Sequence, residues 1–385
     1  MKVLIMSVSA GEGHNSTAKA MRNEFEQLGV ECDILDTINY VSPVLGTFIE
    51  EGYLLITEKA KYAYQLGYEL AERRKNILKD YSPVEILNMI LITELKEVFQ
   101  ENHYDAVVFT HPFAGIMLSL MKKKHDLNLP TVGILTDFTF HPYWENCTRN
   151  DYVVIPDRLL RFQGLQKGFR TEQLLSYGIP INPSFSTILP KQEARKELGL
   201  HFGNEKKMIL VMGGSMGYGN LAETVKHIDE LEIEQDFHIY VVCGNNKEAK
   251  EEVMALEGSV KHSITVTGFV NNISTIMDAA DCIVSKPGGL TTSESMAKGL
   301  PMVIVNPIPG QEQRNAEFLV NQGAAVIASK TCPIEECLYS LLTSETRLNA
   351  MVQCVKELGK PNAASDVCRF VIDLMYTPSI VNRNK

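Results

Sequence analysis

The sequence lacks the features of a disulfide-stabilised, metal-bridged or membrane-spanning protein. Its eight cysteines contain no C-x-x-C pair, so we expect reduced thiols in a cytoplasmic protein and no zinc site. No apolar run reaches the roughly 18 residues of a membrane span, and the apolar N-terminus is too short for a signal peptide. No D-x-D triplet occurs, so no bridging metal ion is indicated.

The net charge is also of the wrong sign for general binding to polyanions. At −10 over 385 residues, it argues against nucleic acid as a partner, and any attraction to a membrane must come from local patches. One candidate patch is residues 39–101, which combine many aromatic residues with a basic cluster at 73–79. This segment could dock on a bilayer, or it could equally be a core helix pair with a solvated end.

The length suits two domains, and proline–glycine breaks suggest where they end. The break G-I-P-I-N-P at residues 178–183 separates an N-terminal domain, 1–188, from a C-terminal domain, 189–360. A further break at 359–361 precedes a C-terminal helix and tail, 361–385, which could cross back to the first domain. Both domains alternate apolar strand-like runs with helical stretches, which indicates an α/β fold with doubly wound parallel sheets.

The first strand–turn–helix unit carries a candidate base. Val3 to Val8 is an apolar run typical of a buried parallel strand, and a helix is expected from about Thr17. The turn between them reads G-E-G-H and lacks the third glycine of a dinucleotide fingerprint, which disfavours NAD. An isolated histidine here would more often only cap the helix. Because it follows G-E-G at a strand end, we favour a general base for His14.

Two further strands, Asp105 to Thr110 and Thr131 to Leu135, end in polar residues on the same sheet edge as His14. The first is followed by His111 and the second by Asp137 and Phe138. Asp137 could orient His14 or bind an acceptor, and an Asx turn after the strand explains it equally well.

The segment from Cys282 to Asn315 is the most informative stretch. It reads as strand, glycine turn, helix, strand, loop and helix. A turn at Gly288 and Gly289 before a helix starting at Leu290 suits a phosphate, and Lys286 adds a cation. Glu294, about 7 Å further along the helix, suits ribose hydroxyls. The turn alone could be an ordinary crossover, but polar residues at the next helix start, Gln311, Glu312 and Asn315, make a nucleotide-sugar site the better interpretation.

The C-terminal domain opens with a strand, Met208 to Met212, and a second glycine-rich loop that includes Gly213 and Ser215. Such loops cradle phosphates or let two domains approach each other.

These motifs resemble glycosyltransferase family 28, the type that includes MurG and monogalactosyldiacylglycerol synthase. The strings K-P-G-G-L-T-T-S-E and P-I-P-G-Q-E-Q-R-N-A are most similar to processive diacylglycerol beta-glucosyltransferases of Gram-positive bacteria, and G-x-G-H, H-P-F and T-D-F-x-x-H also fit. The resemblance implies the GT-B fold, with two Rossmann-like domains facing across a cleft. It implies inverting transfer of glucose or galactose from a UDP-sugar to diacylglycerol, at the inner face of the cell membrane, with no cofactor beyond the UDP-sugar co-substrate.

The resemblance also implies roles for individual residues. His14 would be the base, with Gly13, His111 and Phe138 at the acceptor. Ser215 would contact the diphosphate. Phe269 and Val270, after a strand that ends at Gly268, would hold the uracil.

Three alternatives stay open. A lipid-linked N-acetylglucosaminyltransferase is disfavoured by G-E-G-H and by P-G-Q-E-Q-R-N in place of a Q-Q pair. A UDP-sugar epimerase would need no lipid. A non-catalytic UDP-sugar sensor would not require both His14 and Glu294.

Overall fold

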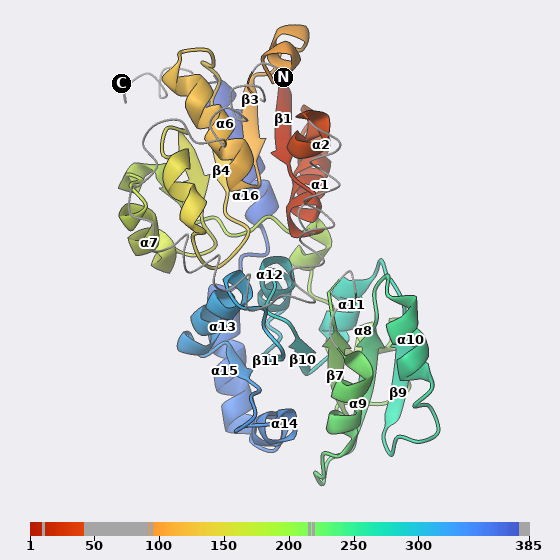
Figure 1. The fold of residues 1–385 in the computed structure, drawn as a ribbon. Helices are drawn as coiled ribbons and strands as arrows, with labels where there is room; N and C mark the ends of the chain where they lie inside the picture. Colours follow the sequence, from red (N-terminus) through yellow and green to blue (C-terminus); the bar gives the residue numbers. More distant parts are fainter. Residues whose placement is uncertain (10–11, 42–91, 93–94, 215–216, 218–219, 377–385) are drawn as a thin grey trace. The chain divides into compact units, whose positions relative to one another are not determined.

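The computed structural model describes residues 1–9, 12–41, 92, 95–214, 217 and 220–376 (Figure 1). The chain divides into two compact units. Unit 1 comprises Met1–Pro183, Ile308–Gln311 and Asn362–Lys385, and unit 2 comprises Ser184–Pro307 and Glu312–Pro361. Of the features proposed above, Ser215 and most of the 39–101 segment lie outside the described residues.

Unit 1 is built on a parallel sheet whose six described strands follow the order β2-β1-β3-β4-β5-β6. The order reverses between β1 and β3, and ligands of open α/β sheets bind beyond the strand ends at such a point. The strands are β1 (Lys2–Ser7), β2 (Glu31–Asp36), β3 (Ala106–Phe109), β4 (Thr131–Ile134), β5 (Tyr152–Val154) and β6 (Leu174–Leu175).

Some helices of unit 1 begin where a side chain satisfies one of the first N–H groups. At α6, for example, His111 is the N-cap and accepts a hydrogen bond from the Phe113 N–H (3.1 Å), with Pro112 at the first helical position. The described helices include α1 (Glu12–Gln27), α2 (Thr37–Val41), α6 (Pro112–Lys123), α7 (Arg161–Gln166) and α16 (Ala363–Tyr376), with 3-10 turns η1 (Pro142–Cys147), η2 (Arg158–Leu160) and η3 (Thr171–Gln173). The 3-10 turn η4 (Pro183–Ser186) spans the boundary between the two units.

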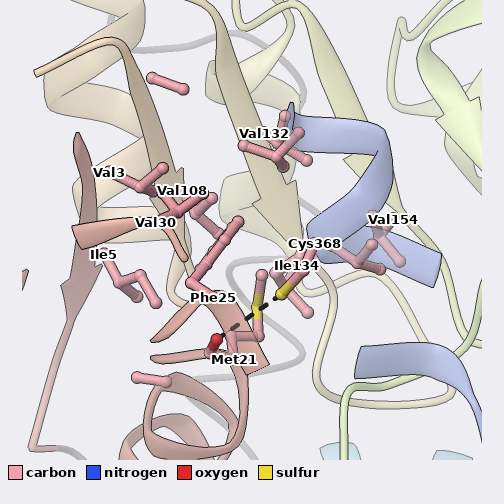
Figure 2. Close-up of a cluster of buried hydrophobic side chains, with 14 of the residues drawn as sticks. Val3, Ile5, Met21, Phe25, Val30, Val108, Val132, Ile134, Val154 and Cys368 are labelled. Carbon is pink, nitrogen blue, oxygen red and sulfur yellow. Dashed lines mark hydrogen bonds between the residues drawn. The ribbon is translucent and has the colours of Figure 1, made fainter. Parts of the chain in front are cut away.

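The C-terminal helix α16 completes the core of unit 1 (Figure 2). Its residues Val367, Cys368 and Val371 are fully buried in one cluster with side chains of β1, β3 and α1. The Cys368 thiol lies 3.6 Å from the Met21 carbonyl oxygen of α1, as Figure 2 shows. Helix α16, whose Cys368 lies 347 residues from Met21 in the sequence, therefore covers the sheet on which the chain begins.

Unit 2 contains a second parallel sheet, with the strand order β12-β11-β10-β7-β8-β9. Counted from β7, this is the Rossmann order, and it reverses between β7 and β10. The predicted α/β fold of two Rossmann-like, doubly wound domains is thus confirmed. The strands are β7 (Lys207–Met212), β8 (Phe237–Val242), β9 (Ser263–Thr267), β10 (Cys282–Ser285), β11 (Met302–Ile304) and β12 (Ala325–Ile327).

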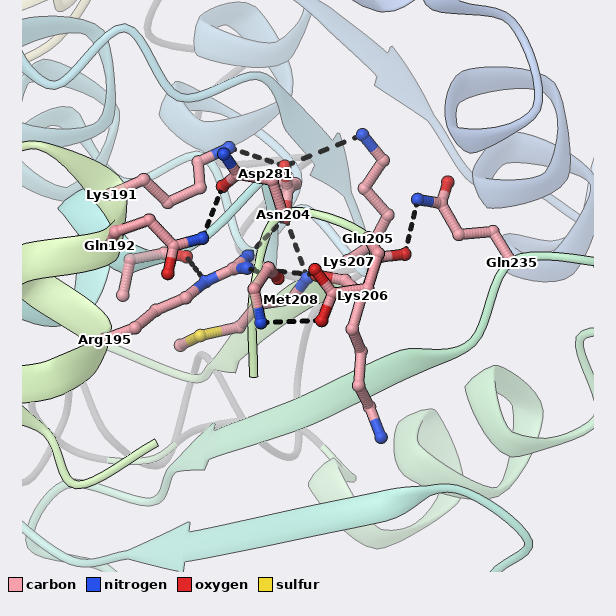
Figure 3. Close-up of polar contacts among 12 residues, drawn as sticks. Lys191, Gln192, Arg195, Asn204, Glu205, Lys206, Lys207, Met208, Gln235 and Asp281 are labelled. Carbon is pink, nitrogen blue, oxygen red and sulfur yellow. Dashed lines mark hydrogen bonds and ion pairs between the residues drawn. The ribbon is translucent and has the colours of Figure 1, made fainter. Parts of the chain in front are cut away.

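A buried ionic cluster anchors the first helix of unit 2 to its sheet (Figure 3). Arg195 is 1% exposed, and its Nη2 lies 2.9 Å from Asp281, which also accepts from the Met208 N–H and pairs with Lys191 (2.6 Å). The helices of unit 2 are α8 (Lys191–Glu197), α9 (Leu221–Asp229), α10 (Lys247–Met254), α11 (Ile273–Ala279), α12 (Gly289–Ala297), α13 (Gln311–Asn321), α14 (Ile334–Leu342) and α15 (Glu345–Leu358).

A second buried pair fixes the chain just after it enters unit 2. Lys298, at the C-cap of α12, lies 2.7 Å from Asp278, and both side chains are almost completely buried. Lys298 also donates to the Thr187 carbonyl, and Asp278 accepts from the Leu189 N–H. The residues that enter unit 2 are therefore held by the end of α12.

Two elements of unit 1 differ clearly from the sequence prediction. Helix α1 begins at Glu12, earlier than the expected Thr17, so His14 lies in its first turn. Gly13 does not prevent this, because glycine can adopt helical φ and ψ at a cost of roughly 0.5–1 kcal/mol relative to alanine. Strand β2 was missed, since it is half-buried and its sequence E-C-D-I-L-D has no continuous apolar run. Among the described helices, none has the length and apolar content to cross a bilayer.

Candidate active site

His14 lies at the reversal point of the unit 1 sheet with a defined tautomer. Its Nδ1 is 2.7 Å from the Thr110 carbonyl oxygen at the end of β3, and 3.3 Å from the Thr136 hydroxyl after β4. A carbonyl can only accept, so we assign the ring hydrogen to Nδ1. The lone pair is then on Nε2, as a general base requires.

The environment of His14 keeps the ring neutral. Burial lowers its pKa below the ordinary 6.5, and this outweighs the opposite effects of the Asp137 charge and of the bond to Thr110. Asp137 therefore acts on His14 electrostatically, from the loop after β4. Near neutral pH the imidazole can accept a proton.

His111 lies beside His14 in the opposite tautomer. The two ring centroids are 4.8 Å apart and nearly perpendicular. Because Nδ1 of His111 accepts from the Phe113 N–H, its hydrogen is on Nε2. Burial, and then the neighbouring His14 and His141, lower the pKa of His111 well below its ordinary value. The pair offers one acceptor and one donor.

The other predicted acceptor residues differ in accessibility. Gly13 is half-buried, and a Cβ there would meet no atom within 4 Å, so packing does not demand glycine. Asp137 is half-buried after β4. Phe138 is only 2% exposed, so it presents almost no surface to an acceptor, unlike the contact predicted for it.

In unit 2, an anion-binding arrangement follows β10. The Ser285 hydroxyl donates to the Met212 carbonyl oxygen of β7 (2.8 Å), which joins the two strands at the reversal point. Lys286 is half-buried in the turn that follows. Helix α12 begins one residue before the predicted Leu290, with Gly288 as an N-cap that makes no side-chain hydrogen bond. Its first N–H groups and dipole suit a phosphate.

Gly288 and Gly289 differ in their surroundings. Gly288 has φ −65°, and a Cβ there would meet nothing within 4 Å, so neither backbone nor packing requires glycine. Gly289 is buried. The open space beside Gly288 is what a ligand approaching the helix start would use.

A hollow lies at the carboxyl ends of β7, β10 and β11, next to Lys286. Sequence reasoning missed Asn306 in its wall, whose φ of +46° lies in the left-handed region. The N-P dipeptide after β11 could have signalled this turn. The lining residues are Val211, Met212, Asn220, Leu221, Thr224, Val284, Lys286, Val305 and Asn306.

The glycine-rich loop after β7 packs closely against the end of β8 at Gly217. Gly213 is buried, and Ser215 lies outside the described residues. Gly217 has φ +62°, and a Cβ there would lie 2.1 Å from the Cys243 carbonyl oxygen. Glycine at 217 is therefore needed to bring the loop against the end of β8.

Glu294 carries a strongly perturbed carboxyl group. Burial raises its pKa from 4.5 to about 8, with no other contributing cause. A carboxyl group with no compensating charge is often part of a binding or catalytic site.

The three polar residues at the start of α13 were all predicted to contact the sugar, but their surroundings differ. Asn315 is completely buried, and its Nδ2 donates to the Pro287 carbonyl oxygen (2.9 Å). Asn315 therefore stabilises the Lys286–Gly288 turn through a buried hydrogen bond, whereas a contact with the sugar was predicted for it. Gln311 and Glu312 open the helix and are half-buried.

The predicted uracil residues follow the edge strand β9. Phe269 is 58% exposed and Val270 is half-buried. From β10 through β7 and β8 to β9 there are three strand spacings, on the order of 14 Å. An extended nucleoside diphosphate suits a span of this order.

Possible metal ligands gather elsewhere. Within the described ranges, His227, Glu230 and Glu335 on α9 and α14 could place three ligand atoms within 4.8 Å of one another. His227 already lies 2.5 Å from Glu335. His227 and Glu335 form an ion pair near the surface, and no candidate site residue is among the three.

Comparison with known proteins places the chain among glycosyltransferases. A family model described as monogalactosyldiacylglycerol (MGDG) synthase matches residues 14–181, and one described as glycosyltransferase family 28 C-terminal domain matches residues 208–367. The chain is 28% identical to a processive diacylglycerol beta-glucosyltransferase of Bacillus pumilus, covering 100% of this chain and 97% of the relative. For the enzyme of the same description from Bacillus subtilis the identity is 28%, with 96% and 94% covered.

Solved structures share the fold. MurG of Acinetobacter baumannii superposes with a TM-score of 0.67 at 16% identity, covering 97% of this chain and 99% of that one. A UDP-GlcNAc 2-epimerase from Neisseria meningitidis, bound to UDP-GlcNAc, gives a TM-score of 0.58 at 14% identity, with 97% and 100% covered. At these identities the likeness concerns the fold alone.

Proposed function

The chain belongs to glycosyltransferase family 28, and on that basis we propose that it transfers a hexose from a UDP-sugar to the hydroxyl of a diacylglycerol, with inversion at the anomeric carbon. The acceptor is proposed from the names of the relatives. The single structural observation that supports the chemistry best is the tautomer of His14, a neutral histidine with its lone pair on Nε2.

Inverting transfer needs one in-line displacement. The acceptor oxygen forms a bond to the anomeric carbon while the bond from that carbon to the diphosphate oxygen breaks, and UDP leaves. The acceptor proton passes to Nε2 of His14, and Nε2–H of His111 can donate to the acceptor oxygen and orient it. Asp137 would stabilise the imidazolium that forms, since its charge already raises the pKa of His14.

On the donor side, residues of unit 2 would stabilise the departing diphosphate. Lys286 and the uncapped N-terminus of α12 supply positive charge and N–H donors. Glu294 would accept hydrogen bonds from the ribose hydroxyls, and Phe269 would stack on uracil. Gln311 and Glu312 are proposed to select the hexose, glucose or galactose. The proposed base belongs to unit 1, and Lys286, Glu294 and Phe269 belong to unit 2.

The test is radiolabel transfer with purified protein, diacylglycerol in detergent micelles, and either UDP-glucose or UDP-galactose. Label should enter the lipid extract from one donor and fall about 10²-fold or more in His14→Ala. His103→Ala, at an exposed histidine before β3, is the matched control and should retain full activity. No lipid label from either donor would refute the proposed acceptor. Label that survives in His14→Ala would move the base elsewhere, with Asp137 the next candidate.

A further inference from the structure

The segment of residues 158–170, R-L-L-R-F-Q-G-L-Q-K-G-F-R, has an unusual composition for this chain. It contains four basic residues and no acidic residue in a protein of net charge −10. It forms η2 and α7 and the turn that follows, at the edge of unit 1 where Figure 1 labels α7. Positive charge is therefore concentrated on one short helical segment.

The same segment exposes large apolar side chains. Leu159 is 43% exposed, Phe162 76% and Leu165 45%. They recur every third residue, which places them along one side of consecutive helical turns. A single exposed leucine is ordinary, but three neighbours including a phenylalanine form a patch that calls for a partner.

The opposite side of the segment packs closely against unit 1, so loose packing is not the reason that Leu159, Phe162 and Leu165 are exposed. Leu160 is 1% exposed, and a Cβ on Gly164 would lie 2.7 Å from the Leu174 side chain. The buried Phe169 ring packs on Phe140, with centroids 5.8 Å apart. The apolar stripe is thus held outward on a rigid support.

The segment is bonded to the loop of the acceptor residues. The Oε1 of Gln163 accepts from the Phe140 N–H (3.0 Å) and from the Thr139 hydroxyl (3.3 Å). These two residues follow Asp137 and Phe138 in the loop after β4. A lipid-binding surface on α7 would therefore be joined to that loop directly, through the hydrogen bonds of Gln163.

The charges around the stripe favour one class of partner. Arg158 and Arg161 are exposed, and no described residue pairs with either. Arg170 is paired with Glu172 (2.6 Å), so the net positive charge comes from the other three basic residues. Cations flanking an apolar stripe match an anionic bilayer, where apolar side chains enter the headgroup region and arginines meet phosphates.

We propose that the 158–170 segment is the surface by which unit 1 docks on an anionic phospholipid bilayer, with Leu159, Phe162 and Leu165 inserted and Arg158 and Arg161 on the headgroups. This deepens the proposed function and rests on it, since a diacylglycerol acceptor must be reached in a membrane. It places docking on a different part of the chain from the 39–101 segment.

Co-sedimentation of the full chain with vesicles tests this directly. Vesicles of phosphatidylcholine alone are compared with vesicles that also contain phosphatidylglycerol, at low and high salt. The wild type should bind the anionic vesicles more tightly, and less so at high salt. Phe162→Ser should weaken binding to both vesicles about tenfold or more, because it removes the largest inserted side chain. Arg158→Gln with Arg161→Gln should lose about tenfold on anionic vesicles only.

Two matched variants control for charge and for surface apolarity. Lys123→Gln with Lys124→Gln removes two exposed cations at the end of α6, and Tyr339→Ser removes a 53% exposed aromatic ring of α14. Both should bind vesicles as the wild type does. Thermal melts of every variant exclude misfolding as the cause of lost binding.

The outcomes separate docking from catalysis. If the wild type does not bind anionic vesicles, or the 158–170 variants bind as tightly as it does, the docking surface is wrong even when transfer to diacylglycerol in detergent succeeds. If vesicle binding follows the expected pattern while no donor gives lipid label, the docking surface stands and the proposed reaction fails.

Discussion

Replacement of Glu294 by glutamine should stabilise the protein, with an effect that grows with pH. Burial raises the pKa of this carboxyl from 4.5 to about 8. The folded state therefore holds the proton more tightly than the unfolded state, and stability is lost as pH rises through this window. One unit of pKa shift corresponds to about 1.4 kcal/mol, so the free energy of unfolding falls by at most about 5 kcal/mol between low pH and pH values above 8.

Urea denaturation of the wild type and Glu294→Gln, at about pH 5 and about pH 8, measures this difference. The variant should be close to the wild type at the lower pH and more stable at the higher. Glu317→Gln, at an exposed glutamate of α13, is the control and should show no such growth. A Glu294→Gln difference that stays constant with pH would refute the burial argument.

The same carboxyl should make donor binding depend on pH. The ribose hydroxyls donate to the ionised form, so below about pH 8 part of the binding free energy is used to remove the proton. Affinity for a UDP-sugar should rise up to about tenfold per pH unit and level off above pH 8. The bridging diphosphate of a UDP-sugar does not titrate in this range, so it adds no slope of its own.

Isothermal titration calorimetry across this range, in two buffers of different ionisation enthalpy, would measure both the affinity and the released proton. Glu294→Gln should bind weakly and without the pH slope. A wild-type affinity that does not change with pH would mean that Glu294 does not ionise on binding, and the ribose contact would be wrong.

Gly13→Ala should leave stability unchanged or raise it by up to about 1 kcal/mol, since a Cβ there meets no atom within 4 Å, while lipid transfer falls. If Gly13→Ala lowered stability and lipid transfer together, the loss of transfer would be explained by misfolding, and the proposed acceptor contact of Gly13 would be contradicted. At saturating UDP-sugar, kcat should fall on acidification only below pH 6.5, because the base must be neutral and burial lowers the pKa of His14. A kcat that already falls above pH 6.5 in the pH–rate profile would refute the assignment of His14 as the base. Asp278→Asn should cost about 3–5 kcal/mol in urea denaturation by leaving the Lys298 charge buried, and Asp278→Leu with Lys298→Met should recover most of it. A single variant as stable as the wild type would show that the pair is not buried in solution.

The positions of several strands and of the main glycine turns could be predicted from the sequence because they depend on local patterns. Runs such as residues 3–8 and 208–212 are apolar since parallel strands are covered on both faces, and both coincide closely with β1 and β7. The start of α12 was predicted to within one residue because the Pro287-Gly288 turn is a local signal in the sequence. An edge strand such as β2 escapes this reasoning, because half of it meets solvent and no apolar run forms.

The state of each site residue depended on contacts between distant parts of the chain. The tautomer of His14 is set by Thr110, 96 residues away, and Asn315 became a support for the donor turn because it is buried against Pro287. Phe138, predicted at the acceptor, is buried, and the stripe at Phe162 was recognised only once its exposure was known. The sequence by itself determined where strands end and which chemical groups follow them, since backbone conformation responds to neighbouring residues. Only the tertiary structure decided which of those groups are buried, paired or presented to a ligand, because burial and pairing arise from segments that meet only after the chain has folded.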